Sequence, residues 1–262
     1  MTDNDYWARQ RVIVTAGASG IGLQIARAYK AAGAQVHVCD IQDDTLAATN
    51  AEGIAAAKCD VSDMAAVEGF VADAVKAMGG LDILVNNAGI AGPAAPLHQM
   101  DPDAWRRTFD VNVHGQFYTA RAAIPHLKAA AAERGGASMV CMASVAGKYA
   151  FPLRSPYAAS KAAVIAIARS LSVELGPEQI RVNAIAPGVV AGDRIRRVFT
   201  DRAAQKGISY DDMAAIALKA VSMKTMVEPD EIAALVMFLT SAAGRPISGQ
   251  VMSICGGLEY TE

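Results

Sequence analysis

Residues 12–32 read VIVTAGASGIGLQIARAYKAA, and this stretch decides the fold. The β-branched run Val12–Thr15 predicts a short buried strand, and the segment Leu23–Ala32 predicts the helix that follows it. The glycines between them let the backbone approach a pyrophosphate and leave the first N–H groups of the helix available to bind it. The loop therefore predicts a dinucleotide site. Its expected contacts are Gly17, Ser19, Gly20, Ile21 and Gly22.

The rest of the chain repeats this alternation of strand and helix. Further short apolar runs lie at 35–40, 55–59, 81–86, 138–143, 181–185 and 250–254. Ala-rich segments of helical period separate them, which is the pattern of a parallel sheet covered by helices on both faces. We therefore predict a doubly wound α/β fold with seven strands. No linker rich in Pro, Gly or Ser interrupts the pattern, so one domain spanning residues 1–262 is expected.

The composition limits the partners of this domain. Its 262 residues, 53% of them apolar, suffice for one large core. The net charge of -2 and the absence of a Lys/Arg-rich run argue against nucleic acid and favour a small molecule. A polar N-terminus and the lack of any apolar run of about 18 residues predict a soluble, cytoplasmic protein that does not enter a membrane. The four cysteines, expected to be buried thiols, and the four histidines lack metal-ligand spacing, so no metal site is expected.

Two of the predicted strands end in an aspartate. Asp40 closes the second strand, eighteen residues after Gly22. A carboxylate there accepts hydrogen bonds from an adenosine ribose diol and repels a 2′-phosphate, which favours NAD over NADP. Asp60 closes the third strand, where it is a candidate partner of the adenine amino group. Each aspartate has an alternative role as the cap of the next helix, which after Asp60 begins at Asp63.

The fourth predicted strand ends in NNAG at residues 86–89. Asparagine and glycine are poor strand formers, so the end of this strand is unusual for a buried sheet. We expect these residues in the crevice at the carboxyl ends of the strands, where ligands of open α/β sheets bind. The alternative for Asn87 and Gly89 is ordinary turn chemistry.

Residues 144–161 read SVAGKYAFPLRSPYAASK and carry a spacing suited to acid/base chemistry. The dipeptide Ser155-Pro156 predicts a helix start with the serine hydroxyl as N-cap. Tyr157 and Lys161 then lie one turn apart on the same face of that helix. The ammonium group favours the phenolate, so the tyrosine can give a proton to an alkoxide and take it back. On the spacing alone, a helix-surface pair is the alternative.

Together these motifs resemble the classical short-chain dehydrogenase/reductase family over essentially the whole chain. The matching segments, in the family's order and spacing, are TAGASGIG at 15–22, Asp60, NNAG at 86–89, Asn112 in VNVHG, Ser144, YAASK at 157–161 and RVNAIAPG at 181–188. The resemblance implies a Rossmann sheet in the order 3-2-1-4-5-6-7. It also implies that Ser144 holds the substrate oxygen and that Tyr157 is the acid/base. Lys161 would bind the nicotinamide ribose, and Asn112 would fix a water that relays protons to Lys161.

The resemblance also extends the cofactor site beyond the glycine-rich loop. The further contacts are Asp40, Asp60, Val61, Asn87, Ala88, Gly89, Tyr157, Lys161, Pro187, Gly188 and Val190. Two positions depart from the family pattern. Ala16 replaces the first loop glycine, which leaves the geometry of the turn open. Gly192 replaces a threonine, so a hydroxyl that would anchor the nicotinamide or pyrophosphate is missing.

The segment 189–226 is predicted to be a substrate lid, because it inserts two amphipathic helical stretches near the substrate end of the sheet. Arg154 lies three residues before Tyr157, where the similar 3-hydroxybutyrate dehydrogenases have a lysine that grips the substrate carboxylate. The planar guanidinium of Arg154 suits a carboxylate or sulfonate. The pocket histidine of those enzymes is Ala146 here, so a different substrate is expected. Predicted substrate contacts are Ser144, Arg154 and Tyr157, with Arg194, Arg196 and Arg197 either turning inward or remaining solvated.

The combined prediction is an NAD-dependent oxidoreductase that interconverts a secondary alcohol and a ketone, acting on a small polar or anionic hydroxy compound. An NAD-binding redox sensor without turnover is one alternative. A sugar-nucleotide epimerase or dehydratase is another, although it would need a larger C-terminal domain. We also predict a homotetramer, because the helices at 102–131 and 156–175 carry apolar residues on more than one face. On the second helix these apolar residues are Val164, Ile165, Ala168 and Leu171.

Overall fold

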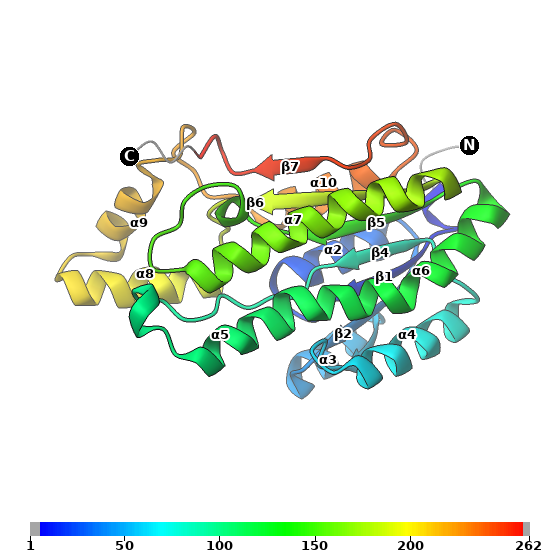
Figure 1. Ribbon diagram of the computed structural model, residues 1–262, viewed down its shortest axis with the longest axis horizontal. Helices are drawn as coiled ribbons and strands as arrows, with labels where there is room; N and C mark the ends of the chain where they lie inside the picture. Colours follow the sequence, from blue (N-terminus) through cyan, green and yellow to red (C-terminus); the bar gives the residue numbers. More distant parts are fainter. Residues whose placement is uncertain (1–5, 259–262) are drawn as a thin grey trace.

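The protein is built on one parallel sheet of seven strands (Figure 1). The computed structural model describes residues 6–258, except for the side chains of residues 194, 201, 202 and 205. The strand order is β3-β2-β1-β4-β5-β6-β7, as predicted. The strands are β1 (Arg11–Thr15), β2 (Gln35–Asp40), β3 (Ala55–Lys58), β4 (Ile83–Asn86), β5 (Ala137–Met142), β6 (Ile180–Pro187) and β7 (Val251–Ile254).

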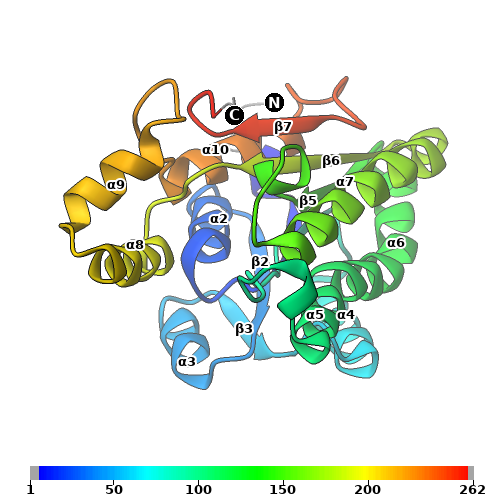
Figure 2. The same cartoon turned by 60° about the vertical axis from the view of Figure 1, so that its left-hand side comes forward.

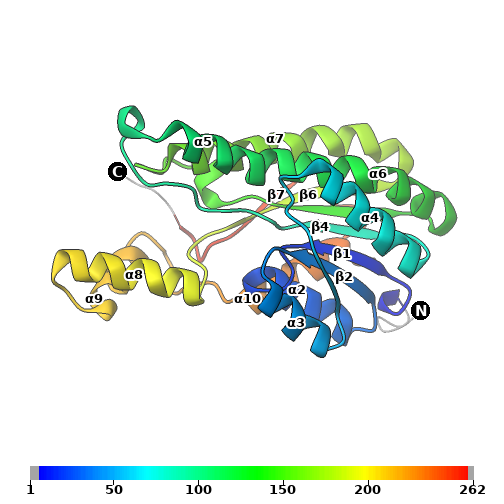
Figure 3. The same ribbon diagram turned by 90° about the horizontal axis from the view of Figure 1, so that it is seen from below.

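Helices cover both faces of the sheet, which gives the three layers visible in Figure 3. One layer contains α4 (Met64–Met78), α5 (Pro102–Phe109), α6 (Gly115–Arg134) and α7 (Ser155–Leu175). The opposite layer contains α2 (Gly20–Ala31), α3 (Asp43–Ala51) and α10 (Pro229–Thr240). None of the helices within residues 6–258 is long and apolar enough to cross a membrane.

The side chains of β1 show how this sheet builds two cores. Ile13 points into the core beneath α4, α6 and α7, while Val12 and Val14 point into the core beneath α2 and α10. Successive side chains of a strand alternate between the two faces, so a strand covered on both sides must be apolar at every position. This explains the apolar run Val12–Val14 in the middle of the first strand.

Because all strands are parallel, their carboxyl ends meet at one edge of the molecule. The helices α8 (Asp193–Lys206) and α9 (Tyr210–Leu218) lie beyond that edge (Figures 1 and 3). They form a small core of their own around Phe199, Ala203 and Met213. Figure 2 shows β3 and β7 at the two outer edges of the sheet, with α8 and α9 to one side. The two predicted helical stretches of segment 189–226 are thus confirmed as helices.

One detail of the predicted helices differs and another is wrong. The helix expected at 102–131 is present, but it contains a π-helical turn at Asp110–His114 between α5 and α6. The helix α7 begins at Ser155 itself, with Arg154 at the N-cap position. The Ser155 hydroxyl is buried and has no hydrogen-bond partner among the described residues, so it does not cap the helix. The start lies one residue earlier because Arg154 adopts the last non-helical backbone conformation, with φ -128° and ψ 30°.

Candidate active site

The glycine-rich loop joins β1 to α2 at the carboxyl edge of the sheet, and its packing accepts only glycine at two positions. A Cβ on Gly17 would lie 2.6 Å from the Cβ of Val38, and a Cβ on Gly22 would lie 2.7 Å from Nδ2 of Asn87. Ser19 is exposed at the N-cap of α2 and makes no capping bond with its side chain. The first N–H groups of a 12-residue helix therefore open toward the loop, which is the arrangement that holds a phosphate.

Ala16 adopts the left-handed conformation that a glycine would normally supply. Its φ is +49°, and Gly20 in the same loop has a φ of +51°. A left-handed backbone costs an alanine about 1–2 kcal/mol. The turn thus keeps its shape despite the departure from the family pattern, and the strain falls on Ala16.

Asp40 and Asp60 close β2 and β3 beside this loop. The Asp40 carboxylate accepts hydrogen bonds from the N–H groups of Ala18 at 3.3 Å and Ile41 at 2.8 Å. It does not cap α3, whose N-cap is Gln42, so that alternative role is wrong. Asp40 therefore stands where the sequence predicts an acceptor for a ribose diol.

Asp60 is held by a network that the sequence did not reveal. Its carboxylate accepts from the N–H and hydroxyl of Ser62 at 2.9 and 2.7 Å, and from Arg107 of α5 at 2.9 Å. Burial opposes ionisation of Asp60, but the bonds from Ser62 and Arg107 outweigh it and lower its pKa. The cap of α4 is Asp63, so capping by Asp60 is also wrong. Val61 next to it is buried against Gly115.

The NNAG segment ties β4 to the glycine-rich loop. Nδ2 of Asn87 donates to the carbonyl oxygens of Thr15 and Ala16 at 3.0 and 3.2 Å. The Thr15 hydroxyl accepts from the N–H groups of Asn87 and Ala88 at 2.9 and 3.0 Å. Thr15 is a residue of this edge that was not predicted from the sequence. A polar residue at the end of a buried apolar strand was the available signal.

Ser144 and Lys161 lie at the carboxyl end of β5, and Tyr157 lies beside the lysine. Ser144 follows this strand and caps the 3-10 turn Val145–Gly147, accepting from the N–H of Ala146 at 3.2 Å. Lys161 is 3% exposed and donates from Nζ to the carbonyl oxygen of Met142 at 2.8 Å. Its ammonium lies 5.9 Å from the centre of the Tyr157 ring. The predicted acid/base group thus has a fixed, buried cation beside it.

Asn112 lies in the π-helical turn and is fully buried. Its Oδ1 accepts from the N–H of Ile90 at 2.7 Å, and its Nδ2 donates to the carbonyl oxygen of Ile90 at 2.9 Å and to Oγ of Ser160 at 3.0 Å. Gly89 lies between Asn112 and Lys161, since a Cβ on Gly89 would be 3.2 Å from Oδ1 and 2.9 Å from Nζ. The structure therefore brings Asn112 next to Lys161.

The end of β6 completes the edge of the site. Pro187 is the last residue of β6, and Gly188 donates from its N–H to the carbonyl oxygen of Ile254 at 2.9 Å. Val190 forms a parallel bridge with Val227, which joins the two ends of the segment that carries α8 and α9. Gly192 is exposed at the N-cap of α8 with a φ of +134°. Main-chain groups, and no hydroxyl, are thus presented at the position of the usual threonine.

Arg154 lies beside the tyrosine. Its Nη2 donates to the carbonyl oxygen of Ala91 at 3.1 Å, and its guanidinium carbon is 5.7 Å from the centre of the Tyr157 ring. The other candidate arginines are further out: Arg196 packs on the Tyr210 ring at 5.8 Å, and Arg197 donates to the carbonyl oxygen of Asp193 at 3.3 Å. The side chain of Arg194 lies outside the described residues. Of the described candidates, only Arg154 is next to the tyrosine.

The remaining polar chemistry of the chain does not compete with this site. All four cysteines fall in the described part of the chain and are free thiols, three of them buried as expected. Burial raises the pKa of the Cys141 thiol to about 12, although the charge of Lys161 works against this shift. Within residues 6–258 no group of His, Cys, Asp or Glu has the arrangement of a metal site.

A parallel Rossmann-type sheet, a phosphate-binding glycine loop and a Ser, Tyr and Lys set at the same edge define a nucleotide-dependent oxidoreductase. The family model described as enoyl-(acyl carrier protein) reductase matches residues 15–259. The chain belongs to the short-chain dehydrogenase/reductase family, whose fold binds a nicotinamide cofactor.

Named relatives differ in what they act on. Galactitol 2-dehydrogenase of Agrobacterium fabrum is 37% identical over 249 residues, covering 94% of this chain and 95% of the relative. The NAD(+)-dependent 2-dehydro-3-deoxy-L-rhamnonate dehydrogenase of a Sphingomonas strain is 41% identical over 183 residues, covering 69% and 72%. A solved actinorhodin polyketide ketoreductase with NADPH superposes with a TM-score of 0.89 at 29% identity, covering all of both chains.

Proposed function

We propose that this protein is an NAD-dependent oxidoreductase that interconverts a secondary alcohol and a ketone. The observation that carries the proposal is the buried ammonium of Lys161 beside Tyr157, at the strand edge that also holds the glycine-rich loop and Asp40. The loop fits the cofactor, because the first N–H groups of α2 are not capped by the Ser19 side chain and can bind a phosphate. Bound NAD would accept or return the hydride.

The residues of the chain handle the proton. The Ser144 hydroxyl donates a hydrogen bond to the substrate oxygen and orients it toward Tyr157. The Tyr157 hydroxyl takes the alcohol proton during oxidation and returns it during reduction. The Lys161 ammonium stabilises the phenolate formed between these steps, because an opposite charge nearby favours the ionised phenol.

The choice of NAD over NADP rests on Asp40. Its carboxylate, fixed by Ala18 and Ile41, would repel a 2′-phosphate and accept hydrogen bonds from a ribose diol. No arginine or lysine lies among residues 41–44 to reverse this preference. The similar ketoreductase is in complex with NADPH, so the test compares both cofactors directly.

For the substrate we propose a small anionic or strongly polar hydroxy compound. Arg154 next to Tyr157 supports this choice, because its guanidinium suits a carboxylate or sulfonate. The names of the relatives include a polyol and a sugar-acid derivative. Segment 189–226 would act as the lid over this substrate, with α8 and α9 moving as one unit on their shared small core.

We further propose a cytoplasmic homotetramer. Val164, Ile165 and Ala168 are buried in the core of their own chain. The expectation that they need cover from another copy is therefore wrong. Phe117 on α6 and Val173 on α7 are 51% and 77% exposed, so their side chains are available for contact with another copy. Light scattering at micromolar concentration should give four times the chain mass, and a monomer mass would contradict this part of the proposal.

A substrate panel tests the proposed function. Purified protein is incubated with NAD or NADP and with hydroxy acids, polyols or cyclic alcohols, and the absorbance of the reduced nicotinamide is followed. We expect turnover with NAD on at least one hydroxy acid or polyol. Absence of turnover on every compound, with intact NAD binding by calorimetry, would favour a sensor over an enzyme.

A further inference from the structure

The YAASK motif contains a buried hydroxyl to which no role has been given. Ser160 lies in α7, one residue before Lys161, and is fully buried. Its Oγ donates to the carbonyl oxygen of Tyr157 at 2.8 Å and accepts from Nδ2 of Asn112 at 3.0 Å. One hydroxyl therefore connects the catalytic helix to the π-helical turn.

The donors and acceptors of this network allow one arrangement. The Tyr157 carbonyl can only accept, so the single hydrogen of Ser160 points toward it. The Ser160 oxygen must then accept from the amide nitrogen of Asn112. This bond requires the same amide orientation as the pair that Asn112 makes with Ile90, in which Nδ2 donates to the carbonyl oxygen at 2.9 Å and Oδ1 accepts from the N–H at 2.7 Å. Ser160 thus adds a third bond that holds this orientation.

The position of Oδ1 matters because Lys161 lies next to it. A Cβ on Gly89 would lie 3.2 Å from Oδ1 and 2.9 Å from Nζ of Lys161, so both atoms border the same side of Gly89. The π-helical turn at Asp110–His114 adds a residue to the helix and presents Asn112 at this point. A rotation of the amide would replace an acceptor by a donor beside the ammonium.

We propose that Ser160 is a positioning residue for the reaction, which holds the amide of Asn112 in the orientation that places Oδ1 beside Lys161. The proposal rests on the proposed function, because its kinetic consequence requires an alcohol oxidoreductase. Its structural part, that Ser160 pins Asn112 and through it Ile90, does not. The two parts are therefore measured separately.

The kinetic test compares Ser160→Ala with Ser172→Ala. Ser172 lies on the same helix and donates to the carbonyl oxygen three residues earlier at 2.7 Å, as Ser160 does, but it does not contact Asn112. Loss of Ser160 leaves a buried N–H of Asn112 without its acceptor and loosens the amide. We expect kcat to fall about five- to twentyfold, with KM values for NAD and substrate changed less than about twofold. The control should match the wild type.

A double-mutant cycle decides whether Ser160 acts through Asn112. In an Asn112→Ala background, adding Ser160→Ala should lower kcat by less than about twofold. The same fold loss in both backgrounds would overturn the proposal, because Ser160 would then act independently. An unchanged kcat in Ser160→Ala alone would overturn it too.

Hydrogen exchange gives a readout that does not need activity. The Ile90 amide should exchange about tenfold faster in Ser160→Ala than in Ser172→Ala, because the amide that accepts from it loses one of its holding bonds. Equal exchange in both variants would contradict the positioning role even if the enzyme had no turnover on any alcohol. If Ser160→Ala does not fold, Ser160→Cys, which is similar in size but a weak donor, replaces it in both measurements.

Discussion

The carboxylate of Asp40 accepts a hydrogen bond from the main-chain N–H of Ala18 at 3.3 Å. This bond joins the acidic end of β2 to the middle of the glycine-rich loop. The negative charge is thereby held beside the loop where the adenosine half of a dinucleotide would bind, and the proposed preference for NAD rests on this placement.

Cofactor preference is the first prediction. We expect kcat/KM with NAD to exceed that with NADP by at least tenfold, about 1.4 kcal/mol, because Asp40 would face the 2′-phosphate. Asp40→Ala should reduce this ratio to less than about threefold. Asp44→Ala, which removes an exposed acid of α3, is the control and should leave the ratio unchanged. Equal efficiency with both cofactors in the wild type would contradict the assignment.

The strained residue of the loop gives a stability prediction. Ala16→Gly should raise the free energy of unfolding by about 0.5–1 kcal/mol, because glycine adopts the left-handed conformation of residue 16 without a steric cost. Ala18→Gly is the control, since Ala18 is buried and has no positive φ. That control should lower stability by about the same amount. Urea titrations of the two variants check both signs, and a destabilised Ala16→Gly protein would show that Ala16 is not strained.

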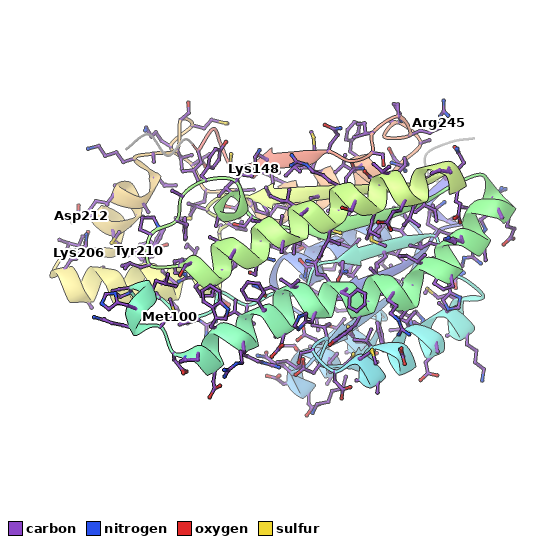
Figure 4. All side chains as sticks on the ribbon, viewed as in Figure 1. Met100, Lys148, Lys206, Tyr210, Asp212 and Arg245 are labelled. Carbon is purple, nitrogen blue, oxygen red and sulfur yellow. The ribbon has the colours of Figure 1, made fainter. Side chains whose placement is uncertain are left out.

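Arg154→Ala tests the charge of the substrate. It should raise KM for an anionic substrate by about ten- to a hundredfold, the loss of a charge-assisted hydrogen bond, and leave KM for NAD unchanged. A neutral polyol should be affected much less. Arg245→Ala provides the matched control, because Arg245 lies at the opposite end of the molecule from the α8 and α9 segment (Figure 4). Identical KM changes for neutral and anionic substrates would remove the basis for an anionic ligand.

The contacts of Gly256 and Gly257 predict how segment 189–226, the proposed lid, is held. Ser222 and Met223 donate to the carbonyl oxygens of Gly257 and Gly256 at 3.0 and 2.9 Å, just after α9. Gly257 has a φ of +73°, and a Cβ there would lie 2.8 Å from Cβ of Ser222. Gly257→Ala should therefore detach this end of the lid and speed tryptic cleavage at Lys206, which lies at the outer end of α8 (Figure 4).

The control for the lid is Gly135→Ala. Gly135 has a similar φ of +84°, but a Cβ there meets nothing within 4 Å. It should lose only the conformational free energy of a left-handed alanine, about 1–2 kcal/mol, with cleavage at Lys206 unchanged. If both variants are cleaved at the same rate, general destabilisation explains the result and the C-terminal contact does not hold the lid.

The sequence was sufficient for the sheet because its information is local. Strands covered on both faces are continuous apolar runs, and the motifs at their ends have fixed spacing. The exact ends of the strands are less well predicted. The strand β4 was expected from Leu81 and begins at Ile83. The one-turn spacing of Tyr157 and Lys161 likewise predicts their neighbouring positions, with the ammonium 5.9 Å from the centre of the ring.

What the sequence did not reveal depends on contacts between distant segments. Arg107 reaches Asp60 from 47 residues away, and Ser160 reaches Asn112 from 48 residues away. The π-helical turn also has no composition signal, because its residues would suit an ordinary helix equally well. The apolar residues of α7 were expected to need cover from another copy. The sequence of one helix does not show how much of its surface the core of its own chain covers.

The measurement that tests the central claim most directly is turnover by Tyr157→Phe. The ring, and its contacts with Arg154 and Lys161 at 5.7 and 5.9 Å, are retained, while the proton donor is removed. We predict that kcat falls by at least about a hundredfold and that the dissociation constant for NADH, measured by fluorescence, changes less than about threefold. Lys161→Ala should impair both. A Tyr157→Phe enzyme that keeps more than about a tenth of the wild-type kcat would contradict the assignment of Tyr157 as the acid/base.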